Sequence, residues 1–395
     1  MRRGKLSVFV LFSVFLCCFF LGSGFSGAEV RAEGEILFQE SGESEGWEKE
    51  LSSYDFSEIE RVMQESLDGQ KISFSEVVWK LIDGNFAEFW ELFWDYAWEA
   101  LWGELRTGRT LAWQVFLIAV AGAVFTNLSR AFTESPISRS GFYVMYMALS
   151  ILLFTGFQMA VSTTAEAFAV LGRVMSAFLP VFFLAVAVQG QMTAAVMYEF
   201  TMVLIRGIQW VFEHVVLLGV RGFVVLQILE GVMPEPFLDR LAGLIKKSVI
   251  WIVKTGFGAV IGFQIVQGLL LPSMDSVKGG MLLRLAKAIP GLGGSVEAAA
   301  QMVFGTAALV RNGIGLAGLL VLLITSLGPL VKLGFLTFLY RVLAAVLQPV
   351  SDKRLLAAID VAGDASGVLL RTLWSGILLF AVAVGVACAC LGGGG

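Results

Sequence analysis

The amino-acid sequence predicts an all-α polytopic membrane protein. In order, we expect a cleaved signal peptide, a short acidic extracytoplasmic helical segment, and about seven to eight transmembrane helices. Of the 395 residues, 57% are hydrophobic and only 15% are charged, whereas charged residues make up about 25% of an average soluble domain. The apolar residues are gathered in blocks of about 20 or more, which is the length that a helix needs to cross a bilayer.

Residues 1–32 have the parts of a secretion signal. "MRRGK" is basic, "LSVFVLFSVFLCCFFLG" is apolar, and "VRAEG" places Val30 and Ala32 at the −3 and −1 positions of a cleavage site. We therefore expect cleavage after Ala32. The alternative is an uncleaved anchor helix, because the apolar run is long for a signal peptide. In both cases the chain that follows lies outside the cytoplasm.

Residues 33–110 form the predicted acidic extracytoplasmic segment. Residues 33–104 contain 19 acidic and 4 basic side chains, whereas residues 105–395 contain 12 acidic and 20 basic ones. "EGEILFQESGESEGWEKE" has the composition of a disordered lead. "SEIERVMQESLDG" and "SEVVWKLIDGN" each open on a capping Ser and end near Gly, which predicts two short helices.

The stretch "FAEFWELFWDYAWEALWGELRTG" predicts an aromatic helix with one acidic face. Four of its acidic residues step by three, four and four, so they form one stripe of a helix. They are Glu88, Glu91, Asp95 and Glu99. Trp and Tyr favour the headgroup region, so we expect an interfacial helix, with an aromatic core stripe of a soluble domain as the alternative. Interfacial helices are usually basic, so an acidic face predicts docking of a protein partner.

Residues 111–391 form the predicted multi-span transmembrane domain. The candidate spans are 111–129, 141–161, 174–192, 195–229, 249–271, 305–327, 330–349 and 370–390. The block 195–229 is too long for one ordinary span, so it is either two spans turning near "EHVVLLG" or one long tilted helix. The loop with Arg130 and Arg139 is cytoplasmic by the positive-inside rule. The sides of the later loops depend on the choice at 195–229, which the sequence leaves open.

This long block carries charges of alternating sign. Glu199, Arg206 and Glu213 step by seven, and Arg221 follows after eight. Charges inside a membrane usually face a bundle interior, a partner or a water-filled cavity. The functional interpretation is therefore a polar stripe that lines a pathway. The alternatives are packing contacts between helices and a turn that is exposed to water.

Two segments resemble each other and suggest an internal repeat. "LDRLAGLIKKSVIWIVKTGFG" at 238–258 and "DKRLLAAIDVAGDASGVLLRTLWSG" at 352–376 share an acidic-basic opening, an amphipathic helix and a basic-Thr pair. If three spans separate the two copies, the repeat is inverted, which is common in transporters. An inverted repeat would suit one candidate function, a stand-alone secondary transporter or permease for a small solute.

The stretch "LRLAKAIPGLGGSVEAAAQ" predicts a hinge between a short basic helix, "VKGGMLLRLAKA", and a second helix that Ser295 caps. Pro lacks the N–H that a helix requires, and Gly permits unusual dihedral angles. The hinge residues are Pro290, Gly291, Gly293 and Gly294. Irregular backbone at membrane depth must be buried in protein or lie beside water. The segment is thus a re-entrant or interfacial hinge, or else an ordinary loop.

The residues offer little for catalysis or for cofactor binding. The chain has four Cys and one His, His214, and neither an HExxH motif nor a paired-aspartate motif is present. We expect no enzyme activity, no catalytic residue, no cofactor, no metal and no nucleic-acid partner.

Several motifs together resemble the stage III sporulation protein AE family. They are the "VRAEG" junction, the span entering "VQG", "LRLAKAIPGLGGSVEAAAQ", "LVRNGIGLAGLLVLL" and "PLVKLGFLTFLYRVLAAVLQP". The resemblance implies a multi-pass protein of the mother-cell membrane around the forespore. It implies as partners membrane lipid, the other stage III A proteins and a forespore membrane protein, in an oligomeric, secretion-like channel complex that late forespore development requires. It implies no catalytic or ligand-binding residues.

Overall fold

The structure is a computed structural model, and it describes residues 55–66, 74–75, 77–78, 86–131, 136–187, 192–233, 237–287, 293–349 and 351–392. These all lie in one compact unit, residues 43–395. The predicted signal peptide and its cleavage residue Ala32 lie outside the described residues.

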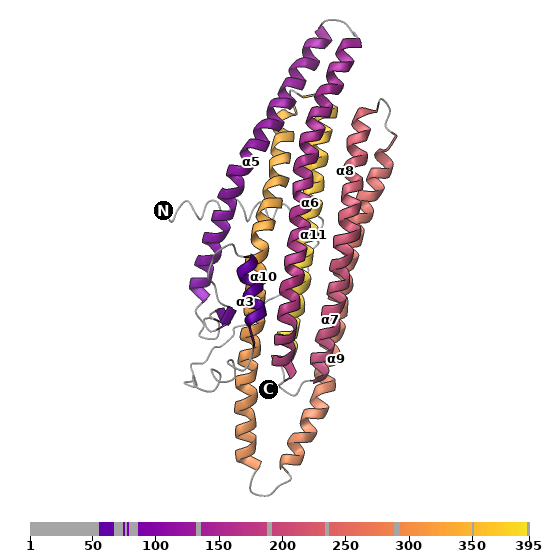
Figure 1. The fold of residues 1–395 in the computed structure, drawn as a ribbon. Coiled ribbons are helices and arrows are strands. Elements are labelled where there is room, and N and C mark those ends of the chain that lie inside the picture. The colour runs from indigo at the N-terminus through magenta and orange to yellow at the C-terminus, as the bar shows by residue number, and fades with distance from the viewer. Residues whose placement is uncertain are drawn as a thin grey trace. The chain divides into compact units, whose positions relative to one another are not determined.

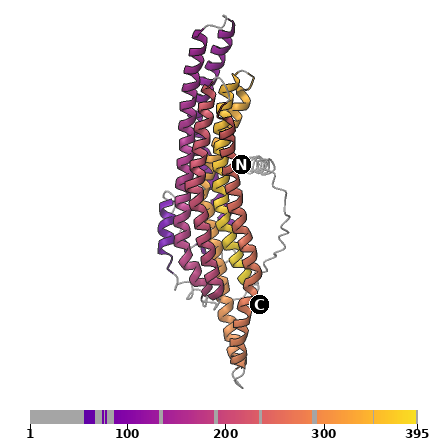
Figure 2. The same cartoon turned by 90° about the vertical axis from the view of Figure 1, so that its right-hand side faces the viewer.

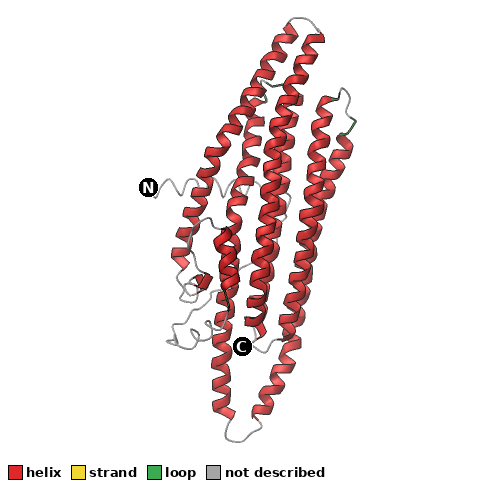
Figure 3. Cartoon of the chain, in the orientation of Figure 1, coloured by secondary structure: helices red, strands yellow, loops and turns green. Residues whose placement is uncertain are grey.

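The described elements are helices, as Figures 1 and 3 show. They are α3 (Ser57–Ser66), α5 (Phe86–Ala131), α6 (Pro136–Ala187), α7 (Met192–Val211), the π-helical η1 (Phe212–Val216), α8 (Leu217–Val232), α9 (Asp239–Lys287), α10 (Gly293–Leu347) and α11 (Lys353–Gly392). The all-α prediction is therefore confirmed for the described part of the chain. Five of its helical segments are long and apolar enough to cross a membrane. These segments are Ser140–Ala185, Val196–Val232, Asp239–Gln267, Gly313–Leu347 and Lys353–Gly385.

The long helices lie side by side and alternate in direction (Figures 1 and 2). We call one end of this bundle the upper end, as drawn in Figure 1. There α5, α8 and α10 end, and α6, α9 and α11 begin. Contacts between distant residues support this arrangement. The Tyr146 hydroxyl donates a hydrogen bond to the Ile228 carbonyl oxygen at 2.9 Å, which joins the first part of α6 to the last part of α8.

The predicted count of seven to eight separate spans is not confirmed. The blocks 141–161 and 174–192 both fall on α6, which runs for 52 residues with Pro180 inside it. The blocks 305–327 and 330–349 likewise fall on α10, with Pro329 inside it. Neither proline ends its helix. Pro removes one backbone hydrogen bond and can kink a helix, and packing on neighbouring helices carries the chain past such a defect.

The block 195–229 is one helix. α7, η1 and α8 follow one another without a break, so the alternative with two spans is wrong. The helix passes "EHVVLLG" through a π-helical turn, in which the Leu217 N–H bonds to the Phe212 carbonyl, five residues earlier. A π-turn holds more residues than an α-turn, and it allows this segment to continue instead of reversing.

These continuous helices give a topology that the sequence left open. Because α6 crosses the bundle only once, Arg240 and Lys353 lie at the same upper end as Arg139. If α5 begins outside the cytoplasm, the upper end is cytoplasmic, as the positive-inside rule prefers. α9 and α11 both start there and run in the same direction. The two similar segments at their starts are therefore not an inverted repeat.

A labelling experiment tests this topology. In a chain whose four native Cys are replaced by Ser, we expect Phe237→Cys to resist a membrane-impermeant thiol reagent in intact cells. Phe237 is 82% exposed at the upper end, so permeabilised cells should label it fully. Gln64→Cys, exposed on α3, should be labelled in intact cells. Labelling of Phe237→Cys from outside would reverse the topology.

The short helix α3 packs its apolar face against the bundle. Phe56, Ile59, Val62 and Met63 are buried in the main core, and Phe56 contacts the ring of Phe74 at 5.2 Å. The predicted cap Ser57 is instead the first helical residue. Its N–H donates to Asp55 Oδ1 at 3.0 Å, and hydrogen bonds from Ser57, chiefly from its side chain, lower the pKa of Asp55.

Candidate functional site

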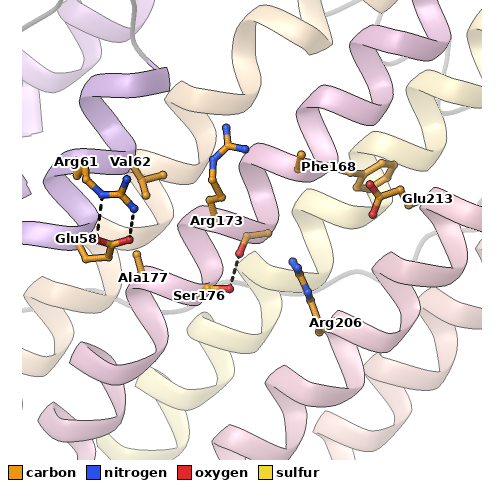
Figure 4. Close-up of a pocket in the computed structure, with 11 residues that line it drawn as sticks. Glu58, Arg61, Val62, Phe168, Arg173, Ser176, Ala177, Arg206 and Glu213 are labelled. Atoms are coloured by element: carbon orange, nitrogen blue, oxygen red, sulfur yellow. Dashed lines mark hydrogen bonds and ion pairs between the residues drawn. The ribbon is translucent and has the colours of Figure 1, made fainter.

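A cavity of about 400 Å³ opens between α3, α6, α7 and η1 (Figure 4). Its lining combines charged residues with small or apolar ones. The charged residues are Glu58, Arg61, Arg173, Arg206 and Glu213, and the others are Val62, Phe168, Ala169, Gly172, Ser176 and Ala177. The cavity thus lies between helix α3 and the charged block of α7 and η1, in which the sequence predicted a polar stripe.

One of the three cavity arginines is engaged by carboxylates of its own helix. Arg61 Nε donates to Glu58 Oε2 at 3.1 Å, and Arg61 Nη1 donates to Glu65 Oε1 at 3.1 Å. The hydrogen bond from Arg61 lowers the pKa of Glu58, and the same bond raises the pKa of Arg61. All of these side chains face water, so the contribution of the pairs to stability is small.

Arg206 lies directly against the backbone of α6. A Cβ atom at Gly172 would lie only 2.0 Å from Arg206 Nη1, so glycine is the residue that leaves room for this guanidinium. The Ser176 hydroxyl beside it donates to the Gly172 carbonyl oxygen at 2.8 Å. Within the part of the chain that the structure describes, neither Arg173 nor Arg206 has an ion pair or a hydrogen bond from its side chain.

The four residues of the predicted polar stripe lie along one edge of a buried face. Glu199, Arg206, Glu213 and Arg221 each directly follow a buried residue, namely Tyr198, Ile205, Phe212 and Val220. The buried positions step by seven, seven and eight, and the π-turn accommodates the additional residue. Only Arg206 and Glu213 line the cavity, and Glu199, Arg206 and Arg221 are all exposed. The pathway interpretation stays a prediction.

A second charged cluster, which was not predicted from the sequence, joins four helices. Lys246 Nζ on α9 pairs with Asp364 Oδ2 on α11, and Arg341 Nη2 on α10 lies 3.7 Å from Asp364 Oδ1. Lys246 Nζ also lies 5.4 Å from the centre of the Phe223 ring on α8. The sequence did hold one indication of a charged face on α11. Asp360, Asp364 and Arg371 are four and seven residues apart, which places them on the same face of that helix.

A comparison with known families agrees with the resemblance noted in the sequence. The sequence model of stage III sporulation protein AE matches residues 72–390. The chain belongs to the stage III sporulation protein AE family. The matched range includes Arg173, Arg206, Glu213 and the Lys246 cluster, whereas α3 lies before it.

A curated relative carries the same name. The stage III sporulation protein AE of Bacillus subtilis (strain 168) is 24% identical over 267 residues, which cover 66% of this chain and 66% of that protein. The match therefore spans slightly less than two thirds of the relative. No solved structure matches the chain.

In this family member, the predicted hinge falls between two long helices. Pro290 and Gly291 lie outside the described residues, while Gly293 and Gly294 are the first two residues of α10. The basic segment before them is not a separate short helix, because α9 continues through it to Lys287. Whether the connection is a re-entrant hinge or an ordinary loop is not tested by these helix ends, and the hinge role stays a prediction.

The predicted docking face of this family member lies on α5. Glu99 is exposed, whereas the side chains of Glu88, Glu91 and Asp95 lie outside the described part. The helix runs unbroken across the predicted domain boundary at residue 110. Further along it, burial raises the pKa of Glu104, and the charge of Lys332 on α10 opposes that shift. The described residues include no group of three His, Cys, Asp or Glu that could hold a metal ion.

Proposed function

We propose that the chain is a polytopic membrane component of a secretion-like channel complex between mother cell and forespore, and that late forespore development requires it. The match to the stage III sporulation protein AE family over residues 72–390 carries this proposal. The five apolar helical segments support a multi-pass membrane protein. The alternative, a stand-alone transporter, has no comparable support.

The proposed location is the mother-cell membrane around the forespore. The proposed partners are the other stage III A proteins, a forespore membrane protein and membrane lipid, in an oligomeric assembly without enzyme activity, cofactor or nucleic acid. Helix length supports a role in assembly. The 52 residues of α6 span about 78 Å at 1.5 Å per residue, whereas the hydrocarbon core is about 30 Å thick. The helices therefore extend into water, where partners bind.

A deletion strain of the source organism tests this function. We expect forespore development in this strain to stop at a late stage, so that few or no spores form. The full-length gene should restore spore formation. A tagged chain should localise to the membrane around the forespore and co-purify with other stage III A proteins. Normal spore yield in the deletion strain would refute the proposal.

The acidic face of α5 is the proposed contact for extracytoplasmic partners. We expect Gln at positions 88, 91, 95 and 99 to leave membrane insertion intact and to reduce co-purification of partners several-fold, because charge complementarity is lost. The replaced residues are Glu88, Glu91, Asp95 and Glu99. Glu166→Gln, which removes an exposed acid of α6, is the control. Unchanged co-purification at physiological salt would count against docking through this face.

A further inference from the structure

We infer that the cavity between α3, α6 and α7 binds an oxyanion of the size of phosphate, held by Arg173 and Arg206. No channel role is needed for this inference, so the binding site and the proposed function can fail independently. The ligand class follows from the charges that line the cavity, from the space made for one guanidinium, and from the level of the bundle at which the cavity opens.

The charge balance leaves two guanidinium groups for a ligand. Arg61 is already paired with the carboxylates of Glu58 and Glu65. Arg173 and Arg206 are both exposed, and neither has a side-chain partner among the described residues. Glu213 is the remaining acid, and in Figure 4 it lies beside Phe168, at the opposite end of the cavity from Arg61. Guanidinium groups carry only donors, in a planar fork that matches phosphate oxygens.

Small residues of α6 provide the space for these groups. Gly172 receives the Arg206 guanidinium, which a Cβ atom would displace, and Ala169 and Ser176 lie one turn before and after it on the cavity wall. The Arg206 guanidinium is thus positioned at the cavity wall by packing against Gly172 and not by an ion pair. A volume of about 400 Å³ is in the range of small-ligand pockets.

The position of the cavity indicates two sources for the oxyanion. Glu58, Arg61 and Glu65 on α3 are exposed, and exposed charges require water or the headgroup region. The neighbouring part of α6 therefore lies outside the hydrocarbon core. A phospholipid headgroup and free phosphate both reach such a level, and basic pockets between membrane helices bind lipid headgroups. Both sources present the same phosphate oxygens to the two arginines.

The test uses the full-length protein purified in detergent, with two probes. One probe is inorganic phosphate, and the other is phosphatidylglycerol, with phosphatidylcholine as the neutral lipid. Affinity is measured by titration calorimetry for phosphate and by native mass spectrometry for lipid. We expect the Arg173→Gln/Arg206→Gln variant to bind at least tenfold more weakly. Glu213→Gln should bind several-fold more tightly, because it removes the opposing charge. Arg240→Gln, exposed on α9, should bind like the wild type.

The outcomes separate the sources and the proposal. Phosphate binding in lipid-free detergent identifies free phosphate, and retention of phosphatidylglycerol over phosphatidylcholine identifies the headgroup. In either case the double arginine variant must lose the binding. The inference is overturned if neither probe binds the wild type, or if Arg240→Gln loses as much as the double variant. If the double variant does not fold, the test rests on the affinity of Glu213→Gln. Tighter binding by that variant supports the site, and unchanged binding overturns it.

Discussion

Replacing Gly318 with alanine is expected to destabilise the helical bundle by about 1–3 kcal/mol, the range for overpacking a filled core. The added Cβ would lie 2.1 Å from Phe178 Cε2. The Phe178 ring has little room to move aside, because it is 1% exposed and packs against the rings of Phe182, at 5.3 Å between centroids, and Phe380, at 5.7 Å. Small residues allow membrane helices to approach closely, and Gly318 does this where α10 meets α6.

The same helix offers a matched control. A Cβ at Gly334 would meet nothing within 4 Å, so Gly334→Ala should be neutral or gain about 0.5–1 kcal/mol from the lower flexibility of the unfolded chain. Unfolding in mixed micelles with increasing SDS compares the two variants with the wild type. Equal stability of the Gly318 and Gly334 variants would show that Phe178 does not constrain the α10 backbone.

Helix type was predictable from the sequence, whereas helix ends were not. Apolar blocks and low charge predict membrane helices, and the described chain is helical throughout its long elements. The ends depend on packing that a single sequence does not display. Pro180 lies inside α6 although proline usually ends or kinks a helix. Residues 162–173, between the two predicted spans on α6, include no proline, so the helix continues.

Only part of each charged site could be predicted. Spacing along one helix predicted Arg206 and Glu213 as members of one stripe, and both line the cavity. Arg173 and Gly172 belong to α6, and the spacing of residues along α7 gives no information about which residues of another helix pack against it. Lys246 and Asp364 are 118 residues apart. Contacts of that kind arise from the arrangement of α9 against α11, which helical spacing does not encode.

The Lys246–Asp364 pair should show strong coupling when both residues are replaced. Asp364→Leu alone leaves Lys246 and Arg341 without their carboxylate, and Lys246→Met alone leaves Asp364 without its closest cation. Removing one partner of a fully buried pair costs about 3–5 kcal/mol. Exposed pairs contribute about 0–1 kcal/mol. The side chains of Lys246 and Asp364 are 31% and 40% exposed, so we expect each single variant to lose about 1–3 kcal/mol.

The double variant, Lys246→Met with Asp364→Leu, should recover most of that loss, because two apolar side chains replace the pair and no charge is left uncompensated between α9 and α11. Arg341 is 56% exposed and remains hydrated. Unfolding free energies of the four proteins complete a double-mutant cycle. A double variant whose loss equals the sum of the single losses would show that the two side chains act independently. Recovery would instead show that the charges matter as a pair, and that α9 and α11 are joined through it.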